Sequence, residues 1–259
     1  MSRFFFAVKV EESKAWFDDH EYRHFQVMRV EEGETIVFTD GRGALFSGVI
    51  SFARDRTTAR ITNKISQTHI PPSQRLAVGI AHAQWDREEV LIEKGTELGV
   101  TDFYLFPGRY SKYRDINLDK VKYTLRKAIK QSENPHLPLC EKFERLEDLL
   151  SRAGEFSSPR NGEFSSPGNE EFPQKIILHP GIVRGIEGSG ALPASPVDLF
   201  ETRRQPKPVM ILVGPEGGFH PEEVQSCVRA GFTACTIGRR TLRLETAALC
   251  GFVWASLSG

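Results

Sequence analysis

Three glycines follow a short apolar stretch in the C-terminal half of the chain, within residues 213–219 (VGPEGGF). The apolar stretch has the composition of a strand, and Pro221 with two glutamates behind it is typical of a helix start. Glycines let a flat ligand approach the backbone closely, and ligands of α/β proteins bind at the carboxyl ends of strands. Because the run lacks a lysine, it does not predict a triphosphate cradle. A binding loop and a plain strand-to-helix turn both agree with it.

A second run, residues 237–247 (IGRRTLRLETA), also follows a strand-like stretch and leads into the last expected helix. Arg243 and Glu245 lie near that helix start, where a carboxylate can cap the helix and an arginine can face an anionic partner. The alternative is an Arg–Glu pair that only fixes the turn. A third run, residues 93–100 (EKGTELGV), ends a helix with a glycine and agrees equally well with an ordinary helix-to-strand connection.

Several common catalytic signatures are absent. Gly41 and Gly43 lack the third glycine of a dinucleotide fingerprint, and the chain contains no GxxxxGK[ST] or GxSxG. Four scattered cysteines without CxxC or Cys/His spacing predict buried thiols, with neither a disulfide framework nor a metal site: Cys140, Cys227, Cys235 and Cys250. No apolar run reaches the roughly 20 residues of a membrane span, and the N-terminus lacks a signal peptide, so we expect a cytoplasmic protein.

Charge is balanced over the whole chain, with 34 basic and 34 acidic residues, but it is uneven locally. Between residues 107 and 130, eight basic residues stand against two acidic ones. Such an excess could follow a nucleic-acid backbone. A solvated helix face explains it as well, so the run needs independent support.

The spacing of apolar residues predicts two domains. Residues 1–70 contain short strands around a helix at 20–30 and a turn at 40–43, which indicates a small β-barrel, and the Pro-Pro pair at 71–72 marks a boundary. Residues 74–259 alternate strands with helices, which predicts an α/β domain with a parallel sheet. The expected strands are 3–8, 35–39, 45–52, 58–64, 76–80, 102–106, 175–178, 209–213 and 233–237, and the expected C-terminal helices are 86–98, 119–132, 221–230 and 245–257.

A polar tandem repeat interrupts this alternation. Residues 154–159 (GEFSSP) recur almost at once at 162–167. Such Gly/Ser/Pro-rich sequence buries little apolar surface, so we expect a flexible surface insertion over 152–173.

Together the motifs resemble the RsmE-type ribosomal RNA small subunit methyltransferases of the SPOUT superfamily, which methylate uridine N3 in 16S rRNA. The motif GPEGG followed at this distance by LRxETA indicates this family far more specifically than either motif alone. The matching positions span nearly the whole chain in the family's order: 24–29 with Gly33, Lys94, 97–100, Gln131, Ser132, 214–218 and 238–247. Three positions depart from the family's pattern, namely Glu133-Asn134 in place of an arginine region, Thr241 in place of an aliphatic residue, and His220 in place of a serine cap.

The resemblance implies a PUA-like N-terminal barrel of residues 1–70 and a SPOUT α/β domain of residues 74–259 that holds a deep trefoil knot. It also implies a homodimer, and an apolar stripe on the last helix is suited to both core and interface burial (Leu249, Phe252, Val253, Leu257). S-adenosyl-L-methionine would bind in the knot without a metal. The expected cofactor-binding residues are Leu178, His179, Gly214, Pro215, Glu216, Gly217, Gly218, Ile237, Gly238, Arg240 and Leu242.

For catalysis we expect direct transfer of the methyl group to N3, whose proton must leave. Arg243 is the candidate cation that stabilises the uracil anion, and Glu245 is a candidate base or orienting residue. The expected RNA-binding residues are His24, Arg29, Arg109, Lys112, Arg114, Lys127 and Lys130. Two alternatives stay open: a non-catalytic RNA-binding module, and a knotted methyltransferase that modifies a ribose 2′-OH or another base. The sequence does not specify the target nucleotide, or whether naked rRNA or an assembled subunit is the substrate.

Overall fold

The computed structural model describes residues 3–53, 56–69, 75–153, 174–180, 197–202 and 208–256. The chain divides into two compact units. The N-terminal unit consists of Met1–Ile70 with Lys122–Pro138, and the α/β unit consists of Pro71–Val121 with Leu139–Gly259. The inclusion of residues 122–138 in the N-terminal unit was not expected from the sequence, because it depends on contacts between segments far apart in the chain.

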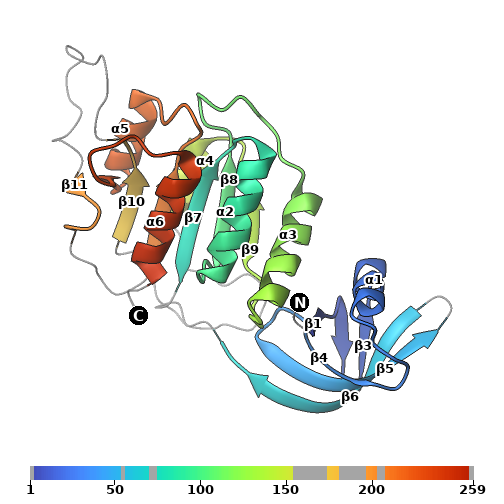
Figure 1. Cartoon of the computed structure of the whole chain (residues 1–259). Coiled ribbons are helices and arrows are strands. Elements are labelled where there is room, and N and C mark those ends of the chain that lie inside the picture. The colour runs from blue at the N-terminus through green and yellow to red at the C-terminus, as the bar shows by residue number, and fades with distance from the viewer. Residues whose placement is uncertain are drawn as a thin grey trace. The chain divides into compact units, whose positions relative to one another are not determined.

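The N-terminal unit contains a curled six-stranded sheet with one short helix against it (Figure 1). The strand order is β1-β4-β5-β6-β3-β2, and Phe5, Phe25 and Phe38 are buried in the core between sheet and helix. The helix is α1 (Asp19–Val27), whose first turn is capped by Asp18. The strands are β1 (Phe4–Phe6), β2 (Lys9–Glu11), β3 (Lys14–Phe17), β4 (Thr35–Thr39), β5 (Ala44–Ala53) and β6 (Arg56–Gln67).

The turn between β4 and β5 is the hairpin expected at residues 40–43, and it also anchors a distant segment. Gly43 adopts a φ of 85°, and a Cβ at this position would collide with the Thr68 carbonyl and the His136 ring. The Gly43 amide donates to the Pro135 carbonyl, and the Leu137 amide donates to the Gly41 carbonyl. These bonds hold residues 135–137 against the turn, which explains their place in the N-terminal unit.

The α/β unit is built on a seven-stranded parallel sheet, as the alternating pattern predicts. Its strand order is β11-β13-β10-β12-β7-β8-β9, and the four central strands are buried along their whole length. The strands are β7 (Leu76–Ala81), β8 (Asp102–Phe106), β9 (Leu139–Lys142), β10 (Gln174–Leu178), β11 (Val197–Asp198), β12 (Val209–Val213) and β13 (Thr233–Thr236).

Helices cover both faces of this sheet. Helices α2 (Trp85–Glu97) and α6 (Leu244–Ser256) pack side by side on one face, and α4 (Leu146–Ala153) and α5 (Pro221–Arg229) pack together on the other (Figure 1). Helix α3 (Leu118–Gln131) begins in the α/β unit and ends in the N-terminal unit. Within the described ranges, no helix combines the length and the apolarity needed to cross a membrane.

Several expectations need correction. Strands β2, β3, β9 and β11 were not expected, because they are short. Helix α4 was also missed, although Leu146, Leu149, Leu150 and Ala153 follow helical spacing. Helix α4 includes Arg152 and buries Ala153, so the expected insertion cannot begin at 152, and its remaining residues 154–173 lie outside the described ranges. Cys227 and Cys235 are buried as expected, whereas Cys140 and Cys250 are only partly buried.

The apolar stripe expected on the last helix divides between the core and the surface. Phe252 is fully buried in the core of the α/β unit, whereas Val253 is exposed. The buried face of α6 also includes three small residues in helical spacing, Ala248, Gly251 and Ala255. Leu257 lies outside the described residues.

Candidate functional site

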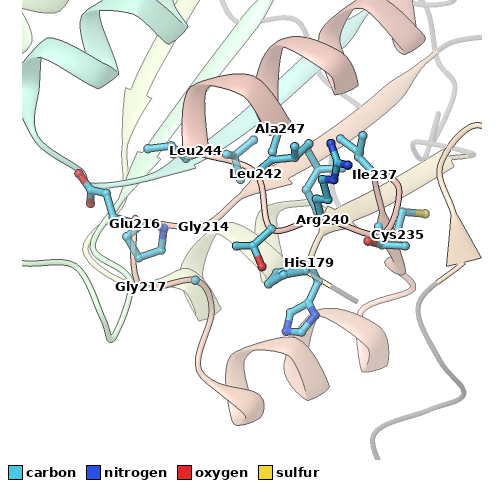
Figure 2. Close-up of a pocket in the computed structure, with 17 residues that line it drawn as sticks. His179, Gly214, Glu216, Gly217, Cys235, Ile237, Arg240, Leu242, Leu244 and Ala247 are labelled. Atoms are coloured by element: carbon cyan, nitrogen blue, oxygen red, sulfur yellow. The ribbon is translucent and has the colours of Figure 1, made fainter. Parts of the chain in front are cut away.

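A cavity opens at the carboxyl ends of three adjacent strands of the α/β unit, beside the start of helix α6 (Figure 2). Strand β10 pairs with both β12 and β13, which brings Leu178, Val213 and Cys235 into register at this edge. The loops that follow these strands form the walls. The lining residues are Leu178, His179, Pro180, Val213, Gly214, Pro215, Glu216, Gly217, Gly218, Cys235, Thr236, Ile237, Arg240, Thr241, Leu242, Leu244 and Ala247.

His179 follows β10 directly and its position is fixed by the backbone. Its amide donates to the Cys235 carbonyl over 2.9 Å, which ties the end of β10 to the end of β13. Burial lowers the pKa of the His179 imidazole below its ordinary value, because desolvation disfavours the charged form. The wall of the cavity at His179 is therefore uncharged at neutral pH.

The glycine-rich loop after β12 has a conformation that requires its glycines. Gly218 adopts a φ of 74°, and its amide donates to the Pro215 carbonyl over 2.8 Å. A Cβ on Gly214 would lie 3.0 Å from the ring of Phe219, a buried residue of the sheet core. The loop is thus a tight turn packed on the core, and its residues from Gly214 to Gly218 line the cavity.

Glu216 connects this loop to the first turn of α2. Its Oε1 accepts a hydrogen bond from the Gln84 amide over 3.2 Å and lies 3.5 Å from Arg87 Nε. The guanidinium of Arg87 also lies 3.5 Å from Glu245 Oε2, at the start of α6. Arg87 therefore links the two motif loops through their carboxylates, a role that sequence reasoning missed because Arg87 belongs to neither motif.

Glu245 keeps an unused acceptor. Its Oε2 is buried and accepts no hydrogen bond from any described residue, although Arg87 is nearby. A buried carboxylate oxygen in this condition is costly unless something donates to it, so such atoms are candidates for ligand contacts.

The helix after the glycine loop begins with a reciprocal cap. His220 Nδ1 accepts from the Glu222 amide, and Glu223 accepts from the His220 amide, as in a capping box. The carboxylate of Glu223 also accepts from the Arg109 amide over 2.9 Å. The histidine that replaces the usual serine therefore performs the capping itself, and the loop is held against residues 108–110.

The structure brings most of the expected cofactor-binding residues together. Ten of the eleven line the cavity, and Gly238 does not. Arg243 is exposed and lies outside the lining, immediately before α6. Among the residues that the structure describes, no group of three His, Cys, Asp or Glu side chains gathers as a metal site would require.

Comparison with known proteins agrees with this geometry. The RNA methyltransferase domain family matches residues 71–255, which is most of the chain, and the RNA methyltransferase PUA domain matches residues 17–62. This chain belongs to the RNA methyltransferase family. The methyltransferase domain includes the whole cavity, and the PUA domain lies within the N-terminal unit.

Curated relatives of this methyltransferase share its length but diverge in sequence. Ribosomal RNA small subunit methyltransferase E of Mycobacterium bovis is 25% identical over 237 residues, covering 89% of this chain and 80% of that protein. The protein of the same name from Rickettsia conorii is 22% identical over 244 residues, covering 93% of this chain and 88% of that protein.

Solved structures of similar methyltransferases share the fold over nearly the full chain. A probable rRNA methyltransferase from Porphyromonas gingivalis superimposes with a TM-score of 0.73 at 26% identity, covering 97% of this chain and 95% of that one. Ribosomal RNA small subunit methyltransferase E from Neisseria gonorrhoeae, bound to S-adenosyl methionine, superimposes with a TM-score of 0.72 at 23% identity, covering 96% of this chain and 94% of that one.

The expected RNA-binding residues of the methyltransferase fall into two groups. In the N-terminal unit, Glu21 lies between His24 and Lys130, with 3.1 Å to His24 Nδ1 and 2.8 Å to Lys130 Nζ. The Glu21 side chain is only 5% exposed and that of Lys130 is 18% exposed, so this cluster also holds α3 onto α1. The second group consists of the five other expected RNA-binding residues, which are all exposed: Arg29, Arg109, Lys112, Arg114 and Lys127.

Proposed function

We propose that this protein transfers a methyl group from S-adenosyl-L-methionine to N3 of a uridine in 16S rRNA of the small ribosomal subunit. The observation that carries the proposal is the cavity at the ends of β10, β12 and β13, where both motif loops meet. The names of the curated relatives and the S-adenosyl methionine bound to the Neisseria gonorrhoeae protein support the same choice of substrate and cofactor. The N3 position rests on the sequence motifs.

The residues of the cavity suit this cofactor. Aliphatic side chains such as Leu178, Ile237 and Leu242 offer apolar contact for an adenine ring, and the bare backbone of the glycine loop offers polar groups for a ribose or an amino acid. The uncharged His179 avoids repulsion with a sulfonium. We assign cofactor binding to the eleven residues expected from the sequence, with Gly238 acting through the turn it forms at a φ of 64°.

When bound, the cofactor supplies an electrophilic methyl group. The uracil must lose its N3 proton before or as N3 bonds to the methyl carbon, and until that bond is complete the negative charge is shared between N3 and the carbonyl oxygens. The bond between the methyl carbon and sulfur breaks in the same step, so that S-adenosylhomocysteine leaves. Arg243, exposed beside the first turn of α6, would stabilise this charge, and the unused acceptor of Glu245 would take the proton or orient its donor. Arg87 would hold Glu245 in position.

We assign RNA binding to the PUA domain and to the exposed cations Arg29, Arg109, Lys112, Arg114 and Lys127. His24 and Lys130 would act by fixing α3 on α1 and so shape that surface. The domain assignment is residues 1–70 for RNA binding and 74–259 for methyl transfer. A trefoil knot around the cavity, a homodimer through the face that carries Val90 and Val253, and a cytoplasmic location complete the proposal.

The test is transfer of labelled methyl from S-adenosyl-L-methionine to unmodified 30S subunits and to naked 16S rRNA, followed by mass spectrometry of the nucleosides. We expect 3-methyluridine. Label in a ribose or in another base would retain the methyltransferase and overturn the position. Cofactor binding without label would overturn the substrate, and no cofactor binding would favour a non-catalytic RNA-binding protein.

A further inference from the structure

Two exposed tyrosines interrupt the basic residues that follow strand β8. Residues 109–114 (RYSKYR) alternate cations with aromatic rings, and Tyr110 and Tyr113 are 49% and 47% exposed. We call this segment the Tyr110 loop. Large aromatic side chains exposed among cations are the composition of surfaces that bind single-stranded nucleic acid, where bases stack on the rings and cations contact the phosphates.

Tyr110 lies directly against the glycine loop. A Cβ added to Gly217, which lines the cavity, would stand 3.0 Å from the Tyr110 Cβ, so the two backbones pack together with no side chain between them. The Tyr110 ring meets the His220 ring with centroids 5.5 Å apart and planes at 62°. This contact supports the ring on one side and leaves about half of the residue open.

The loop that carries Tyr110 is held in place before any ligand arrives. Ser111 is buried, its hydroxyl accepts from the Gly108 amide over 3.0 Å, and its own amide donates to the Gly108 carbonyl. The Arg109 amide is bound by the buried carboxylate of Glu223, which also caps α5. Because the backbone is fixed on both sides of Tyr110, little entropy is lost when a base stacks on its ring.

We infer that Tyr110 is a stacking platform for an unpaired base of the RNA strand, at the mouth of the cavity. This inference rests on the proposed function, since methylation at N3 requires the Watson–Crick edge of the target uridine to be exposed. When a base is turned out of its stack, both the base and its former neighbours lose stacking contacts. An aromatic ring beside the cofactor loop compensates for that loss, and Lys112 and Arg114 supply charge for the adjacent phosphates.

The test compares Tyr110→Phe, Tyr110→Leu and Tyr110→Ala in the full-length protein, with 30S subunits or 16S rRNA as substrate. Wild type is assayed first, so failure of the proposed function appears as absent transfer before any variant is used. We expect Tyr110→Phe to keep the KM for RNA, while Tyr110→Leu and Tyr110→Ala raise it roughly ten- to a hundredfold. The dissociation constant for S-adenosyl-L-methionine should change less than threefold in all variants.

Tyr123→Ala is the matched control, because Tyr123 is 52% exposed among cations but packs on His20 instead of the glycine loop. A second readout places 2-aminopurine beside the target uridine in an RNA oligonucleotide. Its fluorescence should be quenched on binding to wild type and Tyr110→Phe, and not to Tyr110→Leu. An unchanged KM and unchanged quenching in Tyr110→Leu would overturn the inference, as would equal losses in Tyr123→Ala.

Discussion

The two ends of the basic run over residues 107–130 lie in different surroundings. In the N-terminal unit, Lys130 and Arg126 lie against the carboxylates of Glu21 and Asp18, and these pairs join α3 to the start of α1. In the α/β unit, Lys112 and Arg114 stand exposed beside Tyr110 and Tyr113 in the sequence. One continuous basic run in the sequence therefore has two physical roles.

The difference follows from what surrounds each cation. A lysine whose partner is a buried carboxylate is held by a strong, desolvated interaction, and removing it leaves an uncompensated charge. An exposed lysine beside phosphate adds affinity mainly by releasing counterions. A basic run therefore cannot be assigned to RNA binding as a whole, and each cation must be assigned from its neighbours.

The largest expected effect concerns the exposed arginine before α6. Arg243→Ala should lower methyl transfer by about two orders of magnitude, because a cation at a developing negative charge contributes most in the transition state. Single-turnover rates at saturating RNA measure this, and calorimetry with S-adenosyl-L-methionine should give an unchanged affinity. Normal turnover would remove Arg243 from the site, and Arg239→Ala, which changes a nearby exposed arginine, is the control.

The second largest effect is expected on the unfolding free energy and not on the rate of methyl transfer. Lys130→Ala leaves the buried Glu21 carboxylate without its cation and should lower the unfolding free energy by about 2 kcal/mol. Denaturant titration measures it. Arg3→Ala, which breaks an exposed ion pair with Glu34, should cost less than about 0.5 kcal/mol. If Lys130→Ala keeps full stability but loses RNA affinity, the contrast between the two units is wrong.

A smaller effect is expected for an exposed cation of the Tyr110 loop. Lys112→Ala should weaken RNA binding about three- to tenfold and reduce the salt slope of log affinity by about one, because one phosphate contact is lost. Binding isotherms at several salt concentrations measure both quantities. The unfolding free energy should stay at the wild-type value, and a marked loss of stability would contradict the assignment.

The smallest effect is a pH dependence of cofactor binding. Burial lowers the pKa of His179, so the folded protein keeps it neutral while an unfolded chain protonates near pH 6.5. As pH falls below about 6.5, His179 therefore subtracts from stability, and once protonated it repels a sulfonium. Affinity for S-adenosyl-L-methionine should fall about two- to threefold from pH 7.5 to 5.5.

Two controls isolate His179 in that experiment. His179→Gln should make the pH profile flatter, and S-adenosylhomocysteine, which lacks the positive charge, should show less pH dependence than S-adenosyl-L-methionine. Equal profiles for the two ligands would show that the histidine charge does not act on the sulfonium.

Sequence patterns were sufficient to predict the parts of the fold whose signals are local. Long strands with continuous apolar runs, such as residues 209–213 and 102–106, occur at the expected positions, and so do the helices that begin at Pro221 and Leu244 to within a residue. The two motif loops were recognisable because glycine conformations and helix starts leave traces in adjacent residues. The list of cofactor-binding residues came from the family resemblance, and ten of these residues line one cavity.

Only the tertiary structure decided which distant groups meet. Arg87 reaches both Glu216 and Glu245, Tyr110 packs on Gly217, and Lys130 finds Glu21 across more than a hundred residues of chain. Short elements such as β9 and β11 exist because a neighbouring strand offers hydrogen bonds, and their own residues carry little preference. Such contacts depend on the order of strands in the sheet, which no local pattern of residue types encodes.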